Sequence, residues 1–356
     1  MHRAIAAAAG IVVWLAVSAT PVAAAPPDLF GVNQGATLDD RDVPRMRSAG
    51  VRSLRFGINW FRVQPRPGLP NWGPTDALVG DLAARGIRPA PFIYGSPSWV
   101  ASKTYRPPLG SATKVLAWRD FLTLLVERYG PGGAYWTTLY HLQHGASATP
   151  LPINAWQIWN EPNLPKFFPR QGVTRSYATL VRISDDAIGL VDPQAKIVLA
   201  GLTGYAEPTA WSFLNKLYRV RGFKRDFDAV ALHPYAATIG QFRTSVERIR
   251  QVMRKRRDSS TSLWLTEMGW GSARPTRRFP LNKGPRGQKQ MLRKSFALVL
   301  HHRKPWHVQR LFWFDWRDPA RGVGGYCSFC PSAGLLHHNH RAKPAYAAFS
   351  RFTPAG

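Results

Sequence analysis

The sequence predicts one (β/α)8 barrel, and three observations support this fold class. Apolar, strand-like segments alternate with amphipathic, helix-like segments eight times along the 356 residues. The strand-like segments are nearly continuous runs of Val, Ile, Leu, Phe and Ala, as expected for parallel strands covered on both faces. No linker rich in Pro, Gly and Ser divides the chain. The alternative, a doubly wound open sheet, is disfavoured because no Gly-x-Gly-x-x-Gly loop follows the first strand.

Each strand is predicted where an apolar run is bounded by polar or turn-forming residues. In chain order, the predicted strands are Leu29–Gly35, Val51–Ile58, Ile87–Tyr94, Asn154–Glu161, Lys196–Gly201, Asp228–Tyr235, Ser262–Met268 and Val308–Trp316. The catalytic groups of such barrels sit at the carboxyl ends of the strands. The residues that end these segments are therefore the candidates for a site.

A helix is predicted between successive strands, wherever apolar residues recur at helical spacing. The predicted helices are Asp39–Ala49, Thr75–Arg85, Ala112–Tyr129, Val173–Val191, Pro208–Val220, Phe242–Arg256, Gln288–His302 and Pro344–Phe352. Gly50, Gly86 and Gly130 follow the first three, where a left-handed C-cap is expected. Residues Pro131–Pro152 are interpreted as an excursion before the fourth strand rather than as a separate module.

The first 25 residues have the pattern of an export signal. His2 and Arg3 give a positive start, Ile5–Val17 is apolar, and Ala23–Ala25 offers a small-residue cleavage site. A transmembrane anchor is the alternative, but the apolar run is short for a full span. We therefore expect residues 1–25 to be removed and residues 26–356 to form the barrel. The mature protein is expected to be secreted, extracellular or periplasmic, with no membrane anchor and as a monomer.

The chain is strongly basic. Its formal net charge is +28, or +27 without the leader, whose one charged residue is Arg3. Cations are densest in Arg248–Arg257, Lys283–Lys294 and His301–Lys304. Such a surface attracts polyanions, so we expect an anionic polysaccharide substrate or retention at an anionic cell envelope; a general arginine bias explains the charge equally well. No nucleic-acid-binding motif accompanies the charge, so no specific nucleic-acid partner is expected.

Two cysteines, Cys327 and Cys330, are spaced C-x-x-C. A thioredoxin-like redox site is disfavoured because no suitable βαβ unit precedes them. Two ligands are too few for a structural zinc site. In an exported chain the spacing predicts a small disulfide that holds a loop.

A glutamate ends the fourth and the seventh predicted strands. Glu161 stands in Trp159-Asn160-Glu161-Pro162-Asn163, and Glu267 stands in Thr266-Glu267-Met268-Gly269-Trp270. An unpaired carboxylate at the tip of an apolar strand is costly to bury, so packing does not explain the pair. Two carboxylates that face a pocket with aromatic surface are what hydrolysis of a glycosidic bond requires.

These two motifs resemble the clan A glycoside hydrolases, whose acid/base and nucleophile glutamates end strands four and seven. The chain is most similar to the family 39-like branch and to the cellulase-like family 5 branch, from about Phe30 to Phe349. The resemblance implies a retaining O-glycosyl hydrolase with Glu161 as general acid/base and Glu267 as nucleophile. It implies an extracellular poly- or oligosaccharide as the substrate and no cofactor.

The resemblance also assigns residues around the carboxylates. Asn160 matches the residue that hydrogen-bonds the sugar hydroxyl beside the reacting carbon, and Arg55 matches an arginine near the nucleophile; an ordinary ion pair at the rim is the alternative for Arg55. His233 and Tyr235 match a His-x-Tyr pair. Being two apart, they point to the same side of a strand. Tyr235 would hydrogen-bond Glu267, and His233 would line the sugar site.

Tryptophans are the expected sugar-binding surface, because indole rings stack on the C–H faces of sugars. Related enzymes have a tryptophan platform at the end of strand eight, where this chain has Trp313 and Trp316. Three residues apart, they cannot both point inward from a regular strand. Trp316 is the preferred platform, and Trp313 is then packing. The other candidates are Trp99, Trp159, Trp270 and Tyr326.

Other functions stay open at this stage. The run His337-His338-Asn339-His340 has residues of the metal-ligand type, but its position predicts a turn before the last helix. No metal is therefore expected. A transglycosylase would use the same residues with a sugar acceptor in place of water. A noncatalytic polysaccharide-binding barrel would need one carboxylate to be missing, and both are present.

Overall fold

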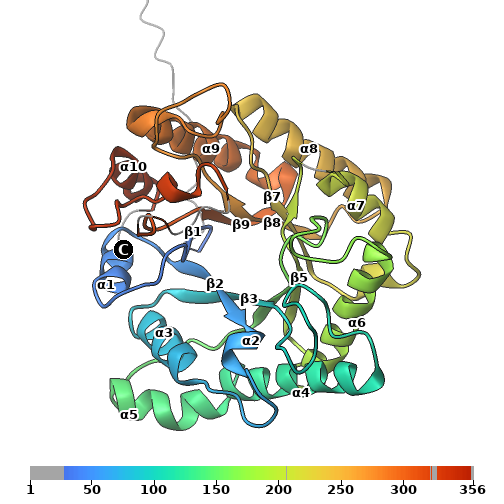
Figure 1. Cartoon of the computed structure of the whole chain (residues 1–356). Helices are drawn as coiled ribbons and strands as arrows, with labels where there is room; N and C mark the ends of the chain where they lie inside the picture. Colours follow the sequence, from blue (N-terminus) through green and yellow to red (C-terminus); the bar gives the residue numbers. More distant parts are fainter. Residues whose placement is uncertain (1–27, 206, 321, 323–326, 354–356) are drawn as a thin grey trace, which may run out of the picture.

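A closed parallel sheet forms the centre of the molecule (Figure 1). The computed structural model describes residues 28–205, 207–320, 322 and 327–353; the expected leader, residues 1–25, lies outside them. Within these residues the strands pair in the order β5-β4-β3-β2-β1-β9-β8-β7-β6, and a further pairing of β5 with β7 closes the ring. The two residues of β6 extend the fifth unit beside β7, so the ring has eight strands. The predicted (β/α)8 barrel is confirmed.

The strands are short and mostly buried. Their bounds are β1 (Phe30–Asn33), β2 (Ser53–Asn59), β3 (Arg88–Tyr94), β4 (Ala155–Ile158), β5 (Lys196–Leu199), β6 (Leu202–Thr203), β7 (Ala229–His233), β8 (Ser262–Met268) and β9 (Val308–Trp313). Every residue of β1 and of β7 is buried. This explains why these segments are apolar throughout instead of alternating.

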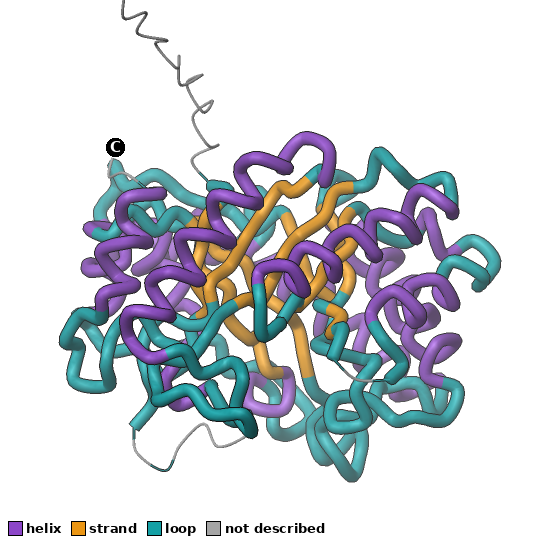
Figure 2. Tube along the Cα trace, turned by 90° about the horizontal axis from the view of Figure 1, so that it is seen from above, coloured by secondary structure: helices purple, strands orange, loops and turns teal. Residues whose placement is uncertain are grey.

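Helices surround the barrel, and in Figure 2 the strands are seen running between them. Their bounds are α1 (Asp42–Ser48), α2 (Trp60–Val63), α3 (Gly73–Ala84), α4 (Ala112–Tyr129), α5 (Tyr140–His144), α6 (Val173–Val191), α7 (Ala210–Leu217), α8 (Ile239–Lys255), α9 (Gly284–Trp306) and α10 (Pro344–Phe352). None of the helices in the described residues is both long and apolar enough to span a bilayer.

Aromatic packing holds the end of the chain against its beginning. The Phe296 ring of α9 stacks on Phe30 of β1 with centroids 4.5 Å apart. Phe349 and Phe352 of α10 approach the same ring edge-on, at 5.8 and 5.4 Å. Such pairs contribute beyond the area that they bury. They join the last helix to the first strand.

Several predicted boundaries were wrong. Five strands end earlier than predicted: β1 at Asn33, β4 at Ile158, β5 at Leu199, β7 at His233 and β9 at Trp313. For β4 the cause is visible, because the backbone enters the left-handed region at Trp159, with φ +74°. The predicted C-caps at Gly50 and Gly86 are left-handed, whereas Gly130 has φ −71° and is extended. The excursion before β4 contains a π-helical turn, Tyr135–Leu139, followed by α5.

Candidate active site

Glu161 and Glu267 lie together at the carboxyl ends of β4 and β8. Glu161 is buried, and 14% of the Glu267 side chain is exposed. One carboxylate oxygen of each glutamate and a ring nitrogen of His233 all lie within 4.8 Å of one another. Two carboxylates this close cannot both ionise without repulsion, so one of them favours the protonated form.

The backbone that carries Glu161 departs from regular geometry. Trp159 and Glu161 have φ values of +74° and +40°, in the region that non-glycine residues rarely adopt. Hydrogen bonds hold the segment there: the Trp159 amide donates to Ile93 O at 2.9 Å, and its indole donates to Phe167 O at 2.7 Å. The side-chain amide of Asn163 donates to Thr203 O at 2.8 Å. The fold thus holds the carboxylate in a costly conformation.

Arg55, on β2, connects the groups around Glu267. Its guanidinium donates to Glu267 Oε1 at 2.7 Å, Gln157 Oε1 at 2.7 Å, Asn33 Oδ1 at 2.9 Å and Asn160 Oδ1 at 3.2 Å. Arg55 is 2% exposed, so this ion pair lies in a low-dielectric environment rather than at a solvated rim.

Two partners of Arg55 were missed by the sequence analysis. Asn33 ends β1, and Gln157 lies within β4. Each is a buried polar side chain in an apolar strand. A polar residue within an apolar run is visible in the sequence, and this could have identified both as candidates. Each is also anchored elsewhere: Asn33 donates to Thr266 O at 3.0 Å and Gln157 to Leu199 O at 2.9 Å. Their oxygens are therefore fixed where Arg55 needs acceptors.

His233 and Tyr235 contact the carboxylates directly. The Tyr235 hydroxyl donates to Glu267 Oε2 at 2.7 Å. His233 Nδ1 lies 2.8 Å from Glu161 Oε1 and 3.5 Å from Glu267 Oε2. The structure thus brings His233 to the carboxylates, as expected of a residue of the sugar site, although its side chain is fully buried. Gly201 makes room for the ring, since a Cβ there would lie 1.9 Å from His233 Nε2.

The two carboxyl groups have opposite pKa shifts. Burial raises the pKa of Glu161 above its usual value, and the negative charge of Glu267 adds to this shift. Burial also acts to raise the pKa of Glu267, but the charges of His233 and Arg55 and the hydrogen bonds from Tyr235 and Arg55 lower it overall. The pair therefore favours a protonated Glu161 beside an ionised Glu267.

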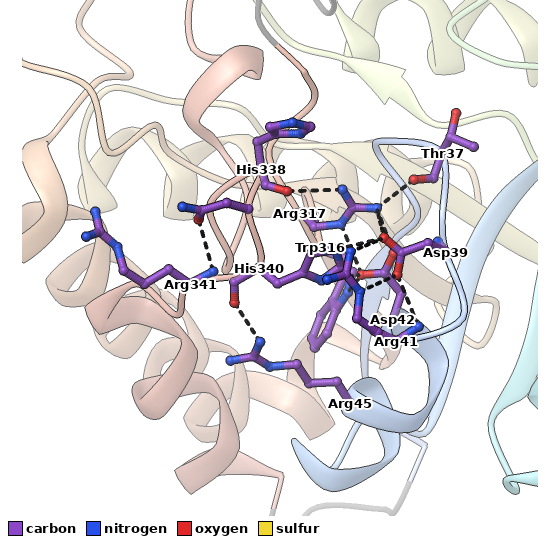
Figure 3. A network of polar contacts seen from close by, with 11 residues as sticks. Thr37, Asp39, Arg41, Asp42, Arg45, Trp316, Arg317, His338, His340 and Arg341 are labelled. Atoms are coloured by element: carbon purple, nitrogen blue, oxygen red, sulfur yellow. Dashed lines mark hydrogen bonds and ion pairs between the residues drawn. The ribbon is translucent and has the colours of Figure 1, made fainter.

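The prediction that Trp316 forms the sugar platform was wrong. Its indole is fully buried and donates to Asp42 Oδ1 at 2.8 Å (Figure 3). Arg317 binds the same aspartate, from Nη2 to Oδ2 at 2.7 Å. β9 ends at Trp313, so the residues after it follow a loop, and strand spacing no longer determines where Trp316 points.

Three of the other four candidate tryptophans are also fully buried, so these three present no free face to a sugar. Their indole nitrogens bind backbone carbonyls: Trp159 that of Phe167, Trp270 that of Ala236, and Trp313 that of Ala333. Trp99 is half-buried and binds Gln64 O at 3.1 Å. Tyr326 lies outside the described residues.

Other rings lie near the carboxylates, and two of them, Phe314 and Tyr205, were not predicted there. Phe314 and Phe329 pack edge-on against Tyr235, with centroids 6.1 and 5.1 Å away. The Tyr205 side chain is 62% exposed. Partial burial of its phenol and the negative charge of nearby Glu161 raise the pKa of Tyr205. The only sequence signal for these two rings is their position: Phe314 lies among the final residues of a predicted strand, and Tyr205 follows shortly after another.

Two groups of metal-ligand type occur in the described residues: Glu161 with His233 and Glu267, and Asp39 with Asp42 and His340. In the first, Arg55 and Tyr235 already bind the oxygens of Glu267. In the second, Arg317 binds Asp42, and Arg41 binds Asp39 at 3.0 Å. These cations and donors satisfy the carboxylates, so the geometry favours hydrogen-bonded networks over a metal centre. His337 and His338 lie outside both groups.

Cys327 and Cys330 form the predicted disulfide, with Cα atoms 5.4 Å apart. The loop that it closes carries Phe329, whose buried ring contacts Tyr235. Tyr235 in turn binds Glu267. The disulfide is therefore two contacts away from a candidate catalytic carboxylate.

We expect replacement of both cysteines by serine to affect substrate binding more than stability. Closing so small a ring contributes little loop entropy, so the free energy of unfolding should fall by only about 1–2 kcal/mol. KM should rise severalfold, because Phe329 would hold Tyr235 less firmly. Denaturant unfolding and steady-state kinetics measure the two effects, with Ser328→Ala as a control in the same loop. Two free thiols in the unreduced wild-type protein would contradict the prediction.

Comparison with known proteins identifies the sequence family. The family model described as "Glycosyl hydrolase catalytic core" matches residues 142–337, more than half of the chain. No curated protein sequence matches the chain.

Solved structures share the fold at low sequence identity. A family 39 glycoside hydrolase from the gut symbiont Bacteroides cellulosilyticus WH2 superposes with a TM-score of 0.68 and 18% identity, over 92% of this chain and 63% of that one. A monomeric beta-xylosidase from Caulobacter crescentus CB15 superposes with a TM-score of 0.63 and 18% identity, over 92% of this chain and 68% of that one. Xylanase 10B from Thermotoga maritima superposes with a TM-score of 0.64 and 14% identity, over 92% of this chain and 95% of that one. The chain thus spans less than two thirds of the first of these structures.

Proposed function

Because the chain belongs to the glycosyl hydrolase catalytic core family, we propose that it cleaves O-glycosidic bonds with retention of configuration at the anomeric carbon. The observation that carries this proposal is the carboxylate pair, with oxygens of Glu161 and Glu267 within 4.8 Å. Retaining enzymes place their carboxyl groups about 5–5.5 Å apart, whereas inverting enzymes leave about 6.5–9.5 Å for a water. The spacing here supports the retaining class.

The first chemical step requires the two carboxyl groups in different protonation states. The ionised Glu267 attacks the anomeric carbon and forms a glycosyl ester, while the bond to the departing oxygen breaks. Glu161 gives its proton to that oxygen. The opposite pKa shifts of the two groups favour this assignment over the reverse.

The second step reverses the role of Glu161. Once Glu267 is an ester, its negative charge is gone, so it no longer raises the pKa of Glu161. The carboxylate of Glu161 can then take a proton from water as the water attacks the anomeric carbon and releases Glu267. Arg55 and Tyr235, which bind the two oxygens of Glu267, stabilise it again as an anion.

Asn160 is proposed to bind the sugar hydroxyl next to the anomeric carbon. Arg55 donates to its Oδ1, which directs the amide nitrogen of Asn160 toward use as a donor. A hydrogen bond at that hydroxyl strengthens as the oxocarbenium-like transition state forms. The Arg55 contact thus links substrate recognition to the environment of Glu267.

We further propose that the enzyme acts outside the cytoplasm on a poly- or oligosaccharide. Two observations support this location: the export-signal pattern of residues 1–25 and the disulfide Cys327–Cys330. Disulfides persist in oxidising compartments and are rare in the cytosol. The positive charge of the chain suits an acidic glycan.

Glu161→Ala tests the acid/base role. It should lower kcat/KM about 10²- to 10⁴-fold on a substrate with a poor leaving group, and much less on a dinitrophenyl glycoside, which needs no protonation. The wild-type profile should fall at low pH as Glu267 is protonated and at high pH as Glu161 loses its proton. The variant should lack the high-pH fall. Equal losses on both substrates with an unchanged pH profile would refute the role.

A further inference from the structure

Three adjacent loops on one side of the barrel rim are rich in cations. The chain leaves β2, β3 and β4 through residues 60–72, 95–111 and 159–172, and these strands are neighbours in the sheet. The cations of these segments are Arg62, Arg66, Lys103, Arg106, Lys166 and Arg170, and all are exposed. The one acidic residue among them is Glu161. One side of the rim therefore combines the candidate acid/base with a positive surface.

The positive charge is concentrated on these loops rather than spread over this side of the molecule. The helices that follow them, α3, α4 and α6, carry five cations and six acidic residues. A general arginine bias would make these helices basic as well, as it does α9, which has six cations and no acid. The contrast locates an excess of positive charge at the carboxyl end of the strands, where the glutamates lie.

Among the described residues, no carboxylate forms an ion pair with five of these six cations. Arg62, Arg66, Lys103, Arg106 and Arg170 form no ion pair with another described residue. Their charges are available to an external anion.

Aromatic rings accompany the cations. The guanidinium of Arg62 lies 5.7 Å from the Phe61 ring centroid, and Lys166 Nζ lies 5.3 Å from that of Phe167. Phe61, Trp99, Tyr105 and Phe167 are all half-buried. Rings of this kind stack on sugar faces, and cations bind carboxylate or sulfate groups. The combination fits a sugar polymer with acidic substituents better than a neutral one.

Hydrogen bonds order the backbone of two of these loops. Leu164 N donates to Glu161 O at 2.9 Å, and Phe167 N donates to Leu164 O at 3.0 Å, so two turns join Glu161 to Lys166. In the loop after β3, Ser96 N donates to Thr104 O at 2.9 Å, and Ser96 Oγ donates to Arg106 O at 2.6 Å. The backbone that carries Lys103, Arg106 and Lys166 is therefore ordered before binding, which lowers the entropy cost of ordering these loops.

We infer that these three loops bind the acidic groups of an anionic polysaccharide and direct the polymer toward Glu161. This inference rests on the proposed function and names its substrate class. The acidic group can be either a carboxylate or a sulfate on a sugar ring, and the test distinguishes these two groups.

The test compares two variants that each remove three positive charges. The first, Arg66→Gln/Lys103→Gln/Arg106→Gln, changes the rim loops. The matched control, Arg293→Gln/Lys294→Gln/Lys304→Gln, changes exposed cations of α9. Affinity electrophoresis measures binding to two pairs of polymers: polygalacturonate with its methyl ester, and dextran sulfate with dextran. Thermal melting checks that both variants are folded.

We expect the wild type and the α9 variant to bind at least one acidic polymer and to ignore its neutral counterpart. The rim variant should bind that polymer roughly tenfold more weakly at 0.1 M salt, where the screening length is about 10 Å. The acidic polymer that is retained identifies carboxylate or sulfate as the ligand group. Equal losses in the two variants, equal retention by neutral polymers, or no binding by the wild type would overturn the inference.

This binding test does not depend on turnover. If the wild type binds an acidic polymer through the rim but hydrolyses no glycoside, the proposed function fails while the rim assignment stands. If it hydrolyses aryl glycosides but shows no difference between the two variants, the rim assignment fails alone.

Discussion

Replacing Glu267 with alanine is expected to abolish turnover on every glycoside tested. The side chain is the candidate nucleophile, and Arg55 and Tyr235 hold it as an anion at 2.7 Å each. Loss of a catalytic nucleophile typically costs about 10⁴- to 10⁶-fold in rate. Steady-state kinetics on an activated aryl glycoside measures the loss. Glu127→Ala, at an exposed acidic residue of α4, serves as the control and should retain wild-type activity.

Rescue by a small anion gives the more specific result. Azide or formate can occupy the space left by the carboxylate and attack the anomeric carbon directly. With Glu161 still present as the acid, the product should be a glycosyl adduct of inverted configuration, whereas the wild-type product retains its configuration. Proton NMR of the first-formed products distinguishes them. Near-wild-type turnover in Glu267→Ala or an inverted wild-type product would contradict the mechanism.

Replacing Asp42 with alanine is expected to cause the largest loss of stability. Its buried carboxylate accepts hydrogen bonds from Trp316 at 2.8 Å, from Arg317 at 3.0 and 2.7 Å, and from the Asp39 amide at 2.9 Å (Figure 3). Arg317 is 5% exposed, so the variant leaves a buried guanidinium without its main anion. Breaking such a pair costs about 3–5 kcal/mol.

Denaturant unfolding measures this loss, with Asp40→Ala as the neighbouring control. Asp40 is exposed, and a surface substitution of this kind should change the free energy of unfolding by about 0.5 kcal/mol or less. A double-mutant cycle with Arg317→Ala separates the coupling of the pair from the loss of each side chain. Asp42→Ala with a loss as small as that of Asp40→Ala would show that the network does not stabilise the fold.

The failure of Trp316 as a sugar platform and its role in this network have one cause. The prediction extended the eighth strand to Trp316, but the strand ends at Trp313. Beyond it, the direction of each side chain depends on contacts with distant segments. Asp42 lies 274 residues away in the sequence and binds the indole. No local pattern contains that contact.

The sequence by itself determined the barrel, the two glutamates as the candidate catalytic pair and the disulfide. These features depend on local periodicity, strand order and short spacing, which a single chain displays directly. The tertiary structure alone decided which strand-end side chains meet. The four acceptors of Arg55 come from three other strands and the turn after β4, and four candidate tryptophans became buried packing. Closing the barrel brings these positions together, and their distances depend on that closure rather than on any one segment.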